Sequence, residues 1–287
     1  MLLTAGVVLL IVAVFAGVYG RRQHRKRAVI RDTETTDIRS IKSESLVALK
    51  GTIRSDDPFD SPIQGETSTL SAWEVEEWDE GGNSEMWETR ATGIYATPFE
   101  LDDETGRVRV NVGTHVDDPS SGTGIHEIQV GPIDVDRLIS NNVTVDDVLT
   151  ALTGFSVEIS ISPDSEPPER ITEFIHGESE VAPQTDSVTN LLDIGNKHGE
   201  RRYYEGTLGP GDEIYLLGQS RATENATRPL KPEDVVVTPP DDGHLVISDK
   251  PESELLDSFG QYKYAYAGAV VAAIAGVIAV TVGAGVV

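Results

Sequence analysis

The chain of 287 residues lacks cysteine altogether and is poor in lysine, and its two ends lack charge. Without cysteine it can form neither a disulfide bond nor a thiolate zinc site in any compartment. Only seven of the 23 basic residues are lysine, against 48 Asp and Glu. No charged side chain occurs in residues 1–20 or 264–287. These absences exclude a disulfide scaffold and a zinc finger, and leave an acidic chain with two apolar ends.

The first uncharged stretch predicts a transmembrane helix over residues 1–20. A helix rises about 1.5 Å per residue, so 20 residues are about as long as the bilayer core is thick. A cleavable secretory signal carries its positive charge before the apolar core, whereas here Arg21–Arg27 follows it. An uncleaved anchor is therefore favoured over a signal peptide. Residues 262–287 predict a second transmembrane helix.

Acidic residues dominate the chain between these spans. Beyond residue 27 there are 18 Lys and Arg against 48 carboxylates, a formal charge of −30. With so few lysines this composition is typical of halophiles, whose surface acids keep the protein hydrated and soluble. A surface of this sign repels polyanions, so we expect no nucleic-acid partner.

The alternation of apolar residues predicts a mainly β (β-rich α+β) domain over residues 46–259, after a basic and polar juxtamembrane segment at 21–45. Antiparallel sheets are expected, and OB-like barrel parts are one arrangement that they could form. Glu85–Ile94 is expected to return along Thr69–Trp78 as a hairpin. Further strands are predicted at 47–53, 107–112, 155–161, 201–208, 213–219, 235–238 and 244–248. Residues 144–152, 167–175 and 251–259 predict short helices.

Five segments resemble the GIDE-type (BAM) domain. They are Leu49–Ile53, Ser61–Gly65, Pro98–Val108, Arg202–Gly218 and Leu245–Leu255. The family is typified by a membrane-anchored mitochondrial E3 ubiquitin ligase, which also holds such a domain between two membrane helices. The resemblance therefore implies a two-anchor membrane protein and, in the family, ubiquitin-protein transferase activity.

The zinc-binding RING of that ligase family cannot be built from this sequence. It needs cysteine ligands, and the six histidines at 24, 115, 126, 176, 198 and 244 are scattered. We therefore predict no catalytic residue, no cofactor site and no metal site. The expected function is a membrane-tethered, non-catalytic interaction or scaffold module for membrane or envelope organisation. An enzyme is the alternative, as a transferase component working with a separate RING partner or as an unrecognised hydrolase.

Several local patterns could carry chemistry, and each has a simpler explanation. The acidic pairs Asp56-Asp57, Asp102-Asp103 and Asp117-Asp118, with Asp241–His244, could bind Ca²⁺ but fit acidic turns better. His126 and His244 lack a matched nucleophile. Gly206–Gly211 reads as a hairpin turn and Arg201–Tyr204 as an amphipathic strand edge. Trp73, Trp78 and Trp87 could line a pocket or form the core of the first hairpin.

The charges beside the spans also predict topology. Basic residues follow the first span and Lys263 precedes the second, which places the soluble domain in the cytoplasm and both termini outside the cell membrane. The sequons at Asn142 and Asn225 would favour export. We expect the lipid bilayer and other proteins as partners. Small residues four apart, such as Gly268, Ala272 and Gly276, predict that the helices pack on each other or across a homodimer.

Overall fold

The computed structural model describes residues 1–79, 86–112, 124–126, 143–145, 147–177, 198–223, 226, 230–260 and 262–285, with the backbone alone at 124–126. The chain divides into two compact units. The helical unit joins Met1–Thr33 to Glu252–Val287, and the β domain is Glu34–Pro251.

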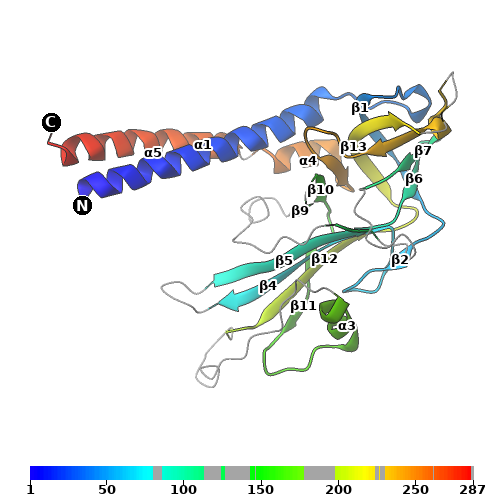
Figure 1. The fold of residues 1–287 in the computed structure, drawn as a ribbon, viewed down its shortest axis with the longest axis horizontal. Coiled ribbons are helices and arrows are strands. Elements are labelled where there is room, and N and C mark those ends of the chain that lie inside the picture. Colours follow the sequence, from blue (N-terminus) through cyan, green and yellow to red (C-terminus); the bar gives the residue numbers. More distant parts are fainter. Residues whose placement is uncertain are drawn as a thin grey trace. The chain divides into compact units, whose positions relative to one another are not determined.

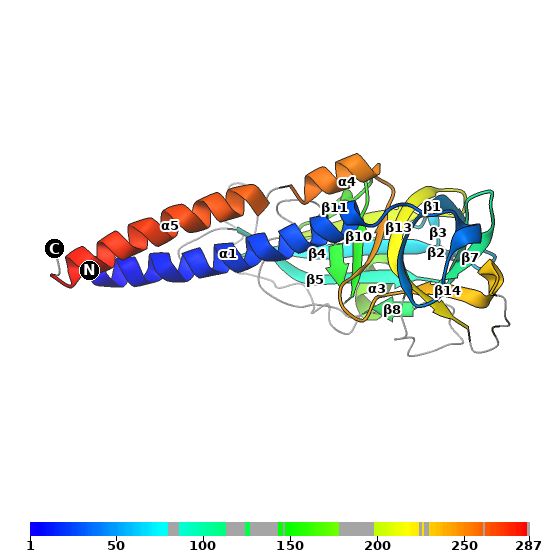
Figure 2. The same ribbon diagram turned by 90° about the horizontal axis from the view of Figure 1, so that it is seen from above.

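The helical unit is built on two long apolar helices. Helix α1 spans Leu2–Asp32 and α5 spans Tyr262–Gly283, with the short α4 at Glu252–Ser258 before it. Both long helices are long and apolar enough to cross a membrane. They lie antiparallel, with the two chain ends together (Figures 1 and 2). Helix α1 continues through the basic run Arg21–Arg27 without a break. The apolar segment and its basic end therefore form one helix about 46 Å long.

Close contact between the long helices depends on glycine. A Cβ placed on Gly276 would lie 2.9 Å from the Leu10 side chain, and one on Gly6 would lie 2.8 Å from the backbone nitrogen of Val280. In contrast, a Cβ on Gly268 would meet nothing within 4 Å. The predicted packing of the two helices on each other is therefore present within one chain, and it uses some of the small residues but not all.

A closed five-stranded barrel is the centre of the β domain. Its strands are β1 (Ser45–Arg54), β6 (Phe99–Asp102), β7 (Arg107–Val110), β13 (Glu213–Ala222) and β14 (Val235–Thr238). The pairs β1–β6, β6–β7, β13–β14 and β1–β13 are antiparallel, and β7–β14 is parallel. Numbered by chain order, the neighbours run first, second, third, fifth, fourth and back to first. This is the OB-type connectivity that the sequence left open.

A second, antiparallel sheet is inserted into the barrel sequence. Its order is β11 (Ser156–Ile161), β12 (Arg201–Leu208), β4 (Leu70–Asp79), β5 (Met86–Ala96) and β8 (Gly124–His126). One face shares the barrel's core through Leu70, Ile94 and Leu208, and the other packs under α3 (Glu169–Gly177) through Trp73, Ile171 and Phe174. The small pair β2 (Phe59–Asp60) and β3 (Thr67–Ser68) lies before β4 in the chain.

The remaining strands extend the barrel sheet from β13. Strand β15 (Leu245–Ser248) pairs with β13, β10 (Val148–Ala151) runs parallel to β15, and β9 (Val143–Val145) pairs with β10. The short helical turns η1 (Ile38–Ser40) and η3 (Pro232–Asp234) complete the described elements.

The helix predicted over Thr144–Leu152 is wrong. Val148–Ala151 is fully buried and hydrogen-bonds to strands on both sides. The β-branched residues Val143, Thr144, Val145 and Val148 suit these strands, and pairing with Leu245–Ser248 outweighs the weak helical pattern.

Two further interpretations need correction. Arg201–Tyr204 is not a strand edge, because β12 lies between β11 and β4. Gly206–Gly211 does turn, with Gly211 at φ +103°, but it joins β12 of one sheet to β13 of the other and forms no hairpin.

Candidate functional site

A buried carboxylate lies at the centre of the first polar cluster in the β domain. Glu205 on β12 is fully inaccessible and lies opposite Trp73 of β4. Its two oxygens accept four hydrogen bonds, from the Ser71 hydroxyl (2.6 Å), the Gln64 amide (2.6 Å), the Ser61 hydroxyl (3.0 Å) and the Ile63 amide (3.4 Å). Three of these donors belong to the loop between β2 and β3, which therefore folds around Glu205.

The surroundings of the loop close this cluster from outside. Arg170 of α3 donates to the Ser61 carbonyl at 3.2 Å, and its guanidinium lies against Gly65, whose φ of +78° disfavours any other residue. Burial raises the pKa of Glu205, and the four hydrogen bonds only partly offset it. A carboxyl group sealed in this way holds the loop and has no route to a substrate.

A second cluster occupies the far end of the same sheet. Arg201 donates to Glu77 at 2.7 Å, and their side chains are 1% and 3% exposed. Arg90 approaches the other oxygen of Glu77 at 3.3 Å. Burial raises the pKa of the neighbouring Tyr203, which therefore remains a neutral phenol at ordinary pH. An ion pair this deeply buried must stay complete, since removing one partner leaves a charge without compensation.

The opposite face of this sheet end combines aromatic and charged side chains. Arg202 lies over the Trp87 ring at 3.8 Å, Trp78 meets Trp87 edge to face at 5.4 Å, and the Tyr204 hydroxyl donates to Glu76 at 2.6 Å. Arg201–Tyr204 therefore divides between the two faces of the sheet, as strand geometry requires. Its cations are paired with Glu77 and stacked on Trp87, so the segment stabilises this sheet end.

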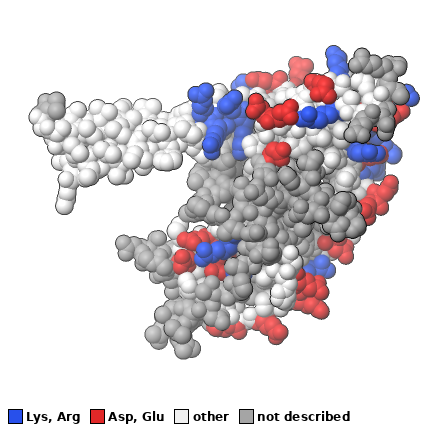
Figure 3. All heavy atoms as spheres, viewed as in Figure 1, with Lys and Arg blue, Asp and Glu red and all other residues white. Residues whose placement is uncertain are grey.

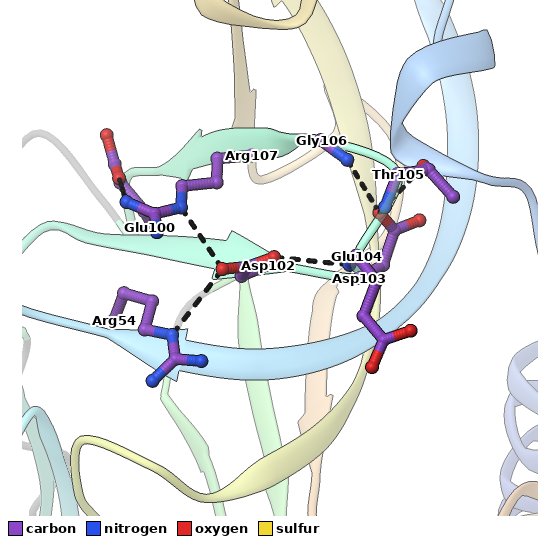
Figure 4. Close-up of polar contacts among 8 residues, drawn as sticks. All are labelled: Arg54, Glu100, Asp102, Asp103, Glu104, Thr105, Gly106 and Arg107. Carbon is purple, nitrogen blue, oxygen red and sulfur yellow. Dashed lines mark hydrogen bonds and ion pairs between the residues drawn. The ribbon is translucent and has the colours of Figure 1, made fainter.

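The third cluster is the turn between β6 and β7 (Figure 4). Asp102 lies between Arg54 and Arg107, with nitrogen–oxygen distances of 3.5 and 3.1 Å. The Glu104 amide donates to Asp102, and this bond, with the two arginines, holds the pKa of Asp102 below its ordinary value. The Glu104 side chain points away from the other residues drawn.

Asp103 organises the inside of that turn. Its carboxylate accepts hydrogen bonds from the amides of Ile38, Thr105 and Gly106 and from the Thr105 hydroxyl, at 2.7–3.1 Å. Burial opposes ionisation, but these bonds outweigh it and lower the pKa of Asp103. This acidic pair, a calcium candidate by sequence, thus serves to close the turn and to attach η1 to it.

The other candidates do not converge on one place. Asp56-Asp57 and Asp241–His244 lie in separate turns, while Asp117 and Asp118 fall outside the described residues, as does the side chain of His126. Over the described ranges no three His, Asp or Glu side chains are grouped so that they could hold a metal ion. Trp73 belongs to the core under α3, and Trp78 and Trp87 are half-buried at the sheet end.

Sequence reasoning missed Glu205 and Glu77, two of the four acids that are buried among the described residues. Both occupy buried positions of strands that were correctly predicted, and each follows a buried apolar residue by two positions, Tyr203 before Glu205 and Val75 before Glu77. An acidic residue at an inward strand position is a usable signal, because it must find donors there.

No protein-family model matches the chain, and comparison with curated proteins and with solved structures likewise gave no match.

Proposed function

We propose that the chain is a two-span membrane protein whose β domain is a non-catalytic interaction module related to the GIDE type. The proposal rests on the two long apolar helices, which lie antiparallel to each other. They come from the two ends of the chain, and the barrel domain lies between them in the sequence. Membrane spans that pair in this way tether the domain at both of its ends.

The position of the family-like segments supports the relationship. Leu49–Ile53 forms part of β1, Pro98–Val108 covers β6 and the start of β7, and Arg202–Gly218 runs from β12 into β13. Leu245–Leu255 runs from β15 into α4. The resemblance thus concentrates on the barrel and on the strand beside it. In these segments Glu205, Asp102 and Asp103 hold the fold, which favours a binding role over a catalytic one.

Photo-crosslinking in intact membranes tests the interaction function. A photoreactive residue replaces Lys50 or Arg109, both exposed on the barrel, or Glu173, exposed on α3. We expect discrete adducts of the same mass from the two barrel positions and not from Glu173. The absence of adducts from every position, or turnover by the purified chain in a ubiquitin-transfer or ester-hydrolysis assay, would contradict the proposal.

The proposed topology places the β domain in the cytoplasm and both termini outside. Because the chain has no native cysteine, single cysteines report cleanly: Asp57→Cys in an exposed turn of the β domain and Ala284→Cys after α5. In intact cells a membrane-impermeant thiol reagent should label Ala284→Cys and should reach Asp57→Cys only after lysis. The reverse pattern would show that the domain is exported.

A further inference from the structure

Five basic side chains gather at one end of the paired helices, and we call them the basic collar. They are Arg21, Arg22, Arg25 and Lys26 of α1, together with Lys263 of α5. Figure 3 shows the uncharged helical segment in white and Lys and Arg side chains in blue where it ends. The four α1 residues fall within about 140° of the helix circumference, because each residue turns the helix by about 100°. They therefore share one side.

The opposite side of the same helical turns is used for internal packing. Gln23 and Ile30 are buried, and Arg27 donates to the Leu256 carbonyl of α4 and approaches Asp257 at 4.0 Å. Arg27 thus fixes α4 from the side of α1 opposite to the collar. Arg21, Arg22 and Arg25 are exposed and, among the described residues, have no carboxylate within ion-pairing distance.

Aromatic contacts fix the level of the collar along the helices. The His24 ring of α1 meets Tyr262 of α5 at 4.9 Å, and Tyr262 meets Tyr266 edge to face at 6.1 Å. A Cβ on Gly20 would lie 3.2 Å from the Tyr266 ring. Lys263 therefore lies at the level of Arg21–Arg25, within one turn of the apolar segment. Tyrosines at this level are typical of the membrane–water interface.

We propose that the basic collar is a binding site for the headgroups of anionic phospholipids. The inference rests on the proposed insertion of α1 and α5 into a membrane. Juxtamembrane Lys and Arg attract anionic lipids, and Arg binds phosphate oxygens in a bidentate manner. The chain beyond residue 27 carries a formal charge of −30 and is repelled by an anionic leaflet. When the collar binds lipid phosphates, its own Arg and Lys side chains neutralise part of that leaflet's charge next to the acidic domain.

Spin-label electron paramagnetic resonance on the full-length protein in nanodiscs measures this preference directly. Nanodiscs of phosphatidylcholine contain a trace of spin-labelled phosphatidylglycerol or of spin-labelled phosphatidylcholine. Lipids in contact with the helices give a motionally restricted signal, from which the relative association constant of the two lipids follows. At 0.15 M salt we expect phosphatidylglycerol to be preferred at least about threefold, and at 1 M salt about equally, because screening weakens exposed charges.

Two variants of equal charge change separate the collar from overall charge. In the collar variant, Gln replaces Arg21, Arg22, Arg25 and Lys26. In the control variant, Gln replaces four exposed cations of the β domain, namely Arg39, Lys42, Lys50 and Arg109. The collar variant should bind both lipids equally, and the control should keep the wild-type preference. Nanodiscs accept either orientation, so a change of topology in cells does not affect the result. Tryptophan fluorescence confirms that each β domain is folded, because all three tryptophans lie on β4 and β5.

The outcomes distinguish this inference from the proposed membrane insertion. If neither spin-labelled lipid gives a restricted signal, the helices are not in the bilayer and the proposed function fails with the inference. A restricted signal with no preference in the wild type, or a preference retained by the collar variant, overturns the lipid site alone.

Discussion

At the scale of single residues, two carboxylates of the β domain, buried Glu205 and half-buried Asp103, hold neighbouring loops in place. Glu205 closes the loop before β3, and Asp103 closes the β6–β7 turn. Their pKa values move in opposite directions: burial outweighs the hydrogen bonds at Glu205, whereas at Asp103 four hydrogen bonds together outweigh burial. The contributions of Glu205 and Asp103 to folding stability should therefore change in opposite directions as the pH changes.

Replacement of Glu205 tests whether its hydrogen bonds to the β2–β3 loop stabilise the domain. Glu205→Leu leaves the Gln64 amide and two serine hydroxyls buried without an acceptor, so we expect a loss of about 3 kcal/mol in unfolding free energy. Glu205→Gln retains one acceptor oxygen and offers an amide donor to Ser71, and should cost less. Urea unfolding followed by tryptophan fluorescence gives both values. Equal losses in the two variants would show that the hydrogen bonds do not matter.

The same residue predicts a pH dependence. The pKa of Glu205 is higher in the folded than in the unfolded chain, so its contribution to stability is complete below about pH 4.5 and is lost as the pH rises through the folded value. Wild type should therefore lose stability relative to Glu205→Gln as the pH rises from 4 to 7. A constant difference between the two proteins over that range would contradict the prediction.

Asp103 should show the reverse. Its pKa is lowered by folding, so its stabilising effect is present above its ordinary value of about 3.8 and is lost as the pH falls through the folded value. Asp103→Asn should lower the unfolding midpoint at pH 7 and approach wild type in strong acid. The matched control is Asp57→Asn, in an exposed turn, which should leave the midpoint unchanged. If the Asp103→Asn protein were as stable as this control, the Asp103 carboxylate would not stabilise the β6–β7 turn.

At the scale of elements, β11 shows how one irregularity changes the meaning of a pattern. The alternation of Phe155, Val157, Ile159 and Ile161 predicts one apolar face, and the strand is present. A bulge between Val157 and Ile159 switches the face. Phe155 consequently stacks on Tyr204 beside the barrel core, Ile161 packs under α3, and Val157 is 42% exposed.

The helix pair offers a clean comparison of two glycines on one helix. Gly276→Ile should separate α5 from α1, because its side chain would meet Leu10 and the Gly6 carbonyl. Gly268→Ile is the matched control, since it has space. Cysteines at Leu3 and Val282 bridged by a short bis-maleimide measure the packing: bridging should fall severalfold in Gly276→Ile and persist in Gly268→Ile. Equal bridging in both variants would remove glycine contact as the cause, and a dimer-sized product would instead indicate packing between chains.

At the scale of the whole molecule, the excess negative charge should make stability depend on salt. Like charges on the β domain repel one another, and the Debye length falls from about 30 Å at 0.01 M salt to about 3 Å at 1 M. The thermal unfolding midpoint of the full-length protein, followed by tryptophan fluorescence in nanodiscs, should rise as KCl increases from millimolar to molar. An unchanged midpoint would show that the charges are too well hydrated to interact.

Composition and periodicity alone determined the long apolar helices, most strands and the mainly β class, because each depends on neighbours along the chain. Val235–Thr238 and the hairpin of β4 and β5 needed nothing further. Long-range pairing decided the rest. Barrel closure pairs β1 with β13 from a distant part of the chain, and pairing with β9 and β15 makes a strand of Val148–Ala151. The donors of Glu205 lie more than 130 residues away in the chain, and no local pattern encodes such a distance.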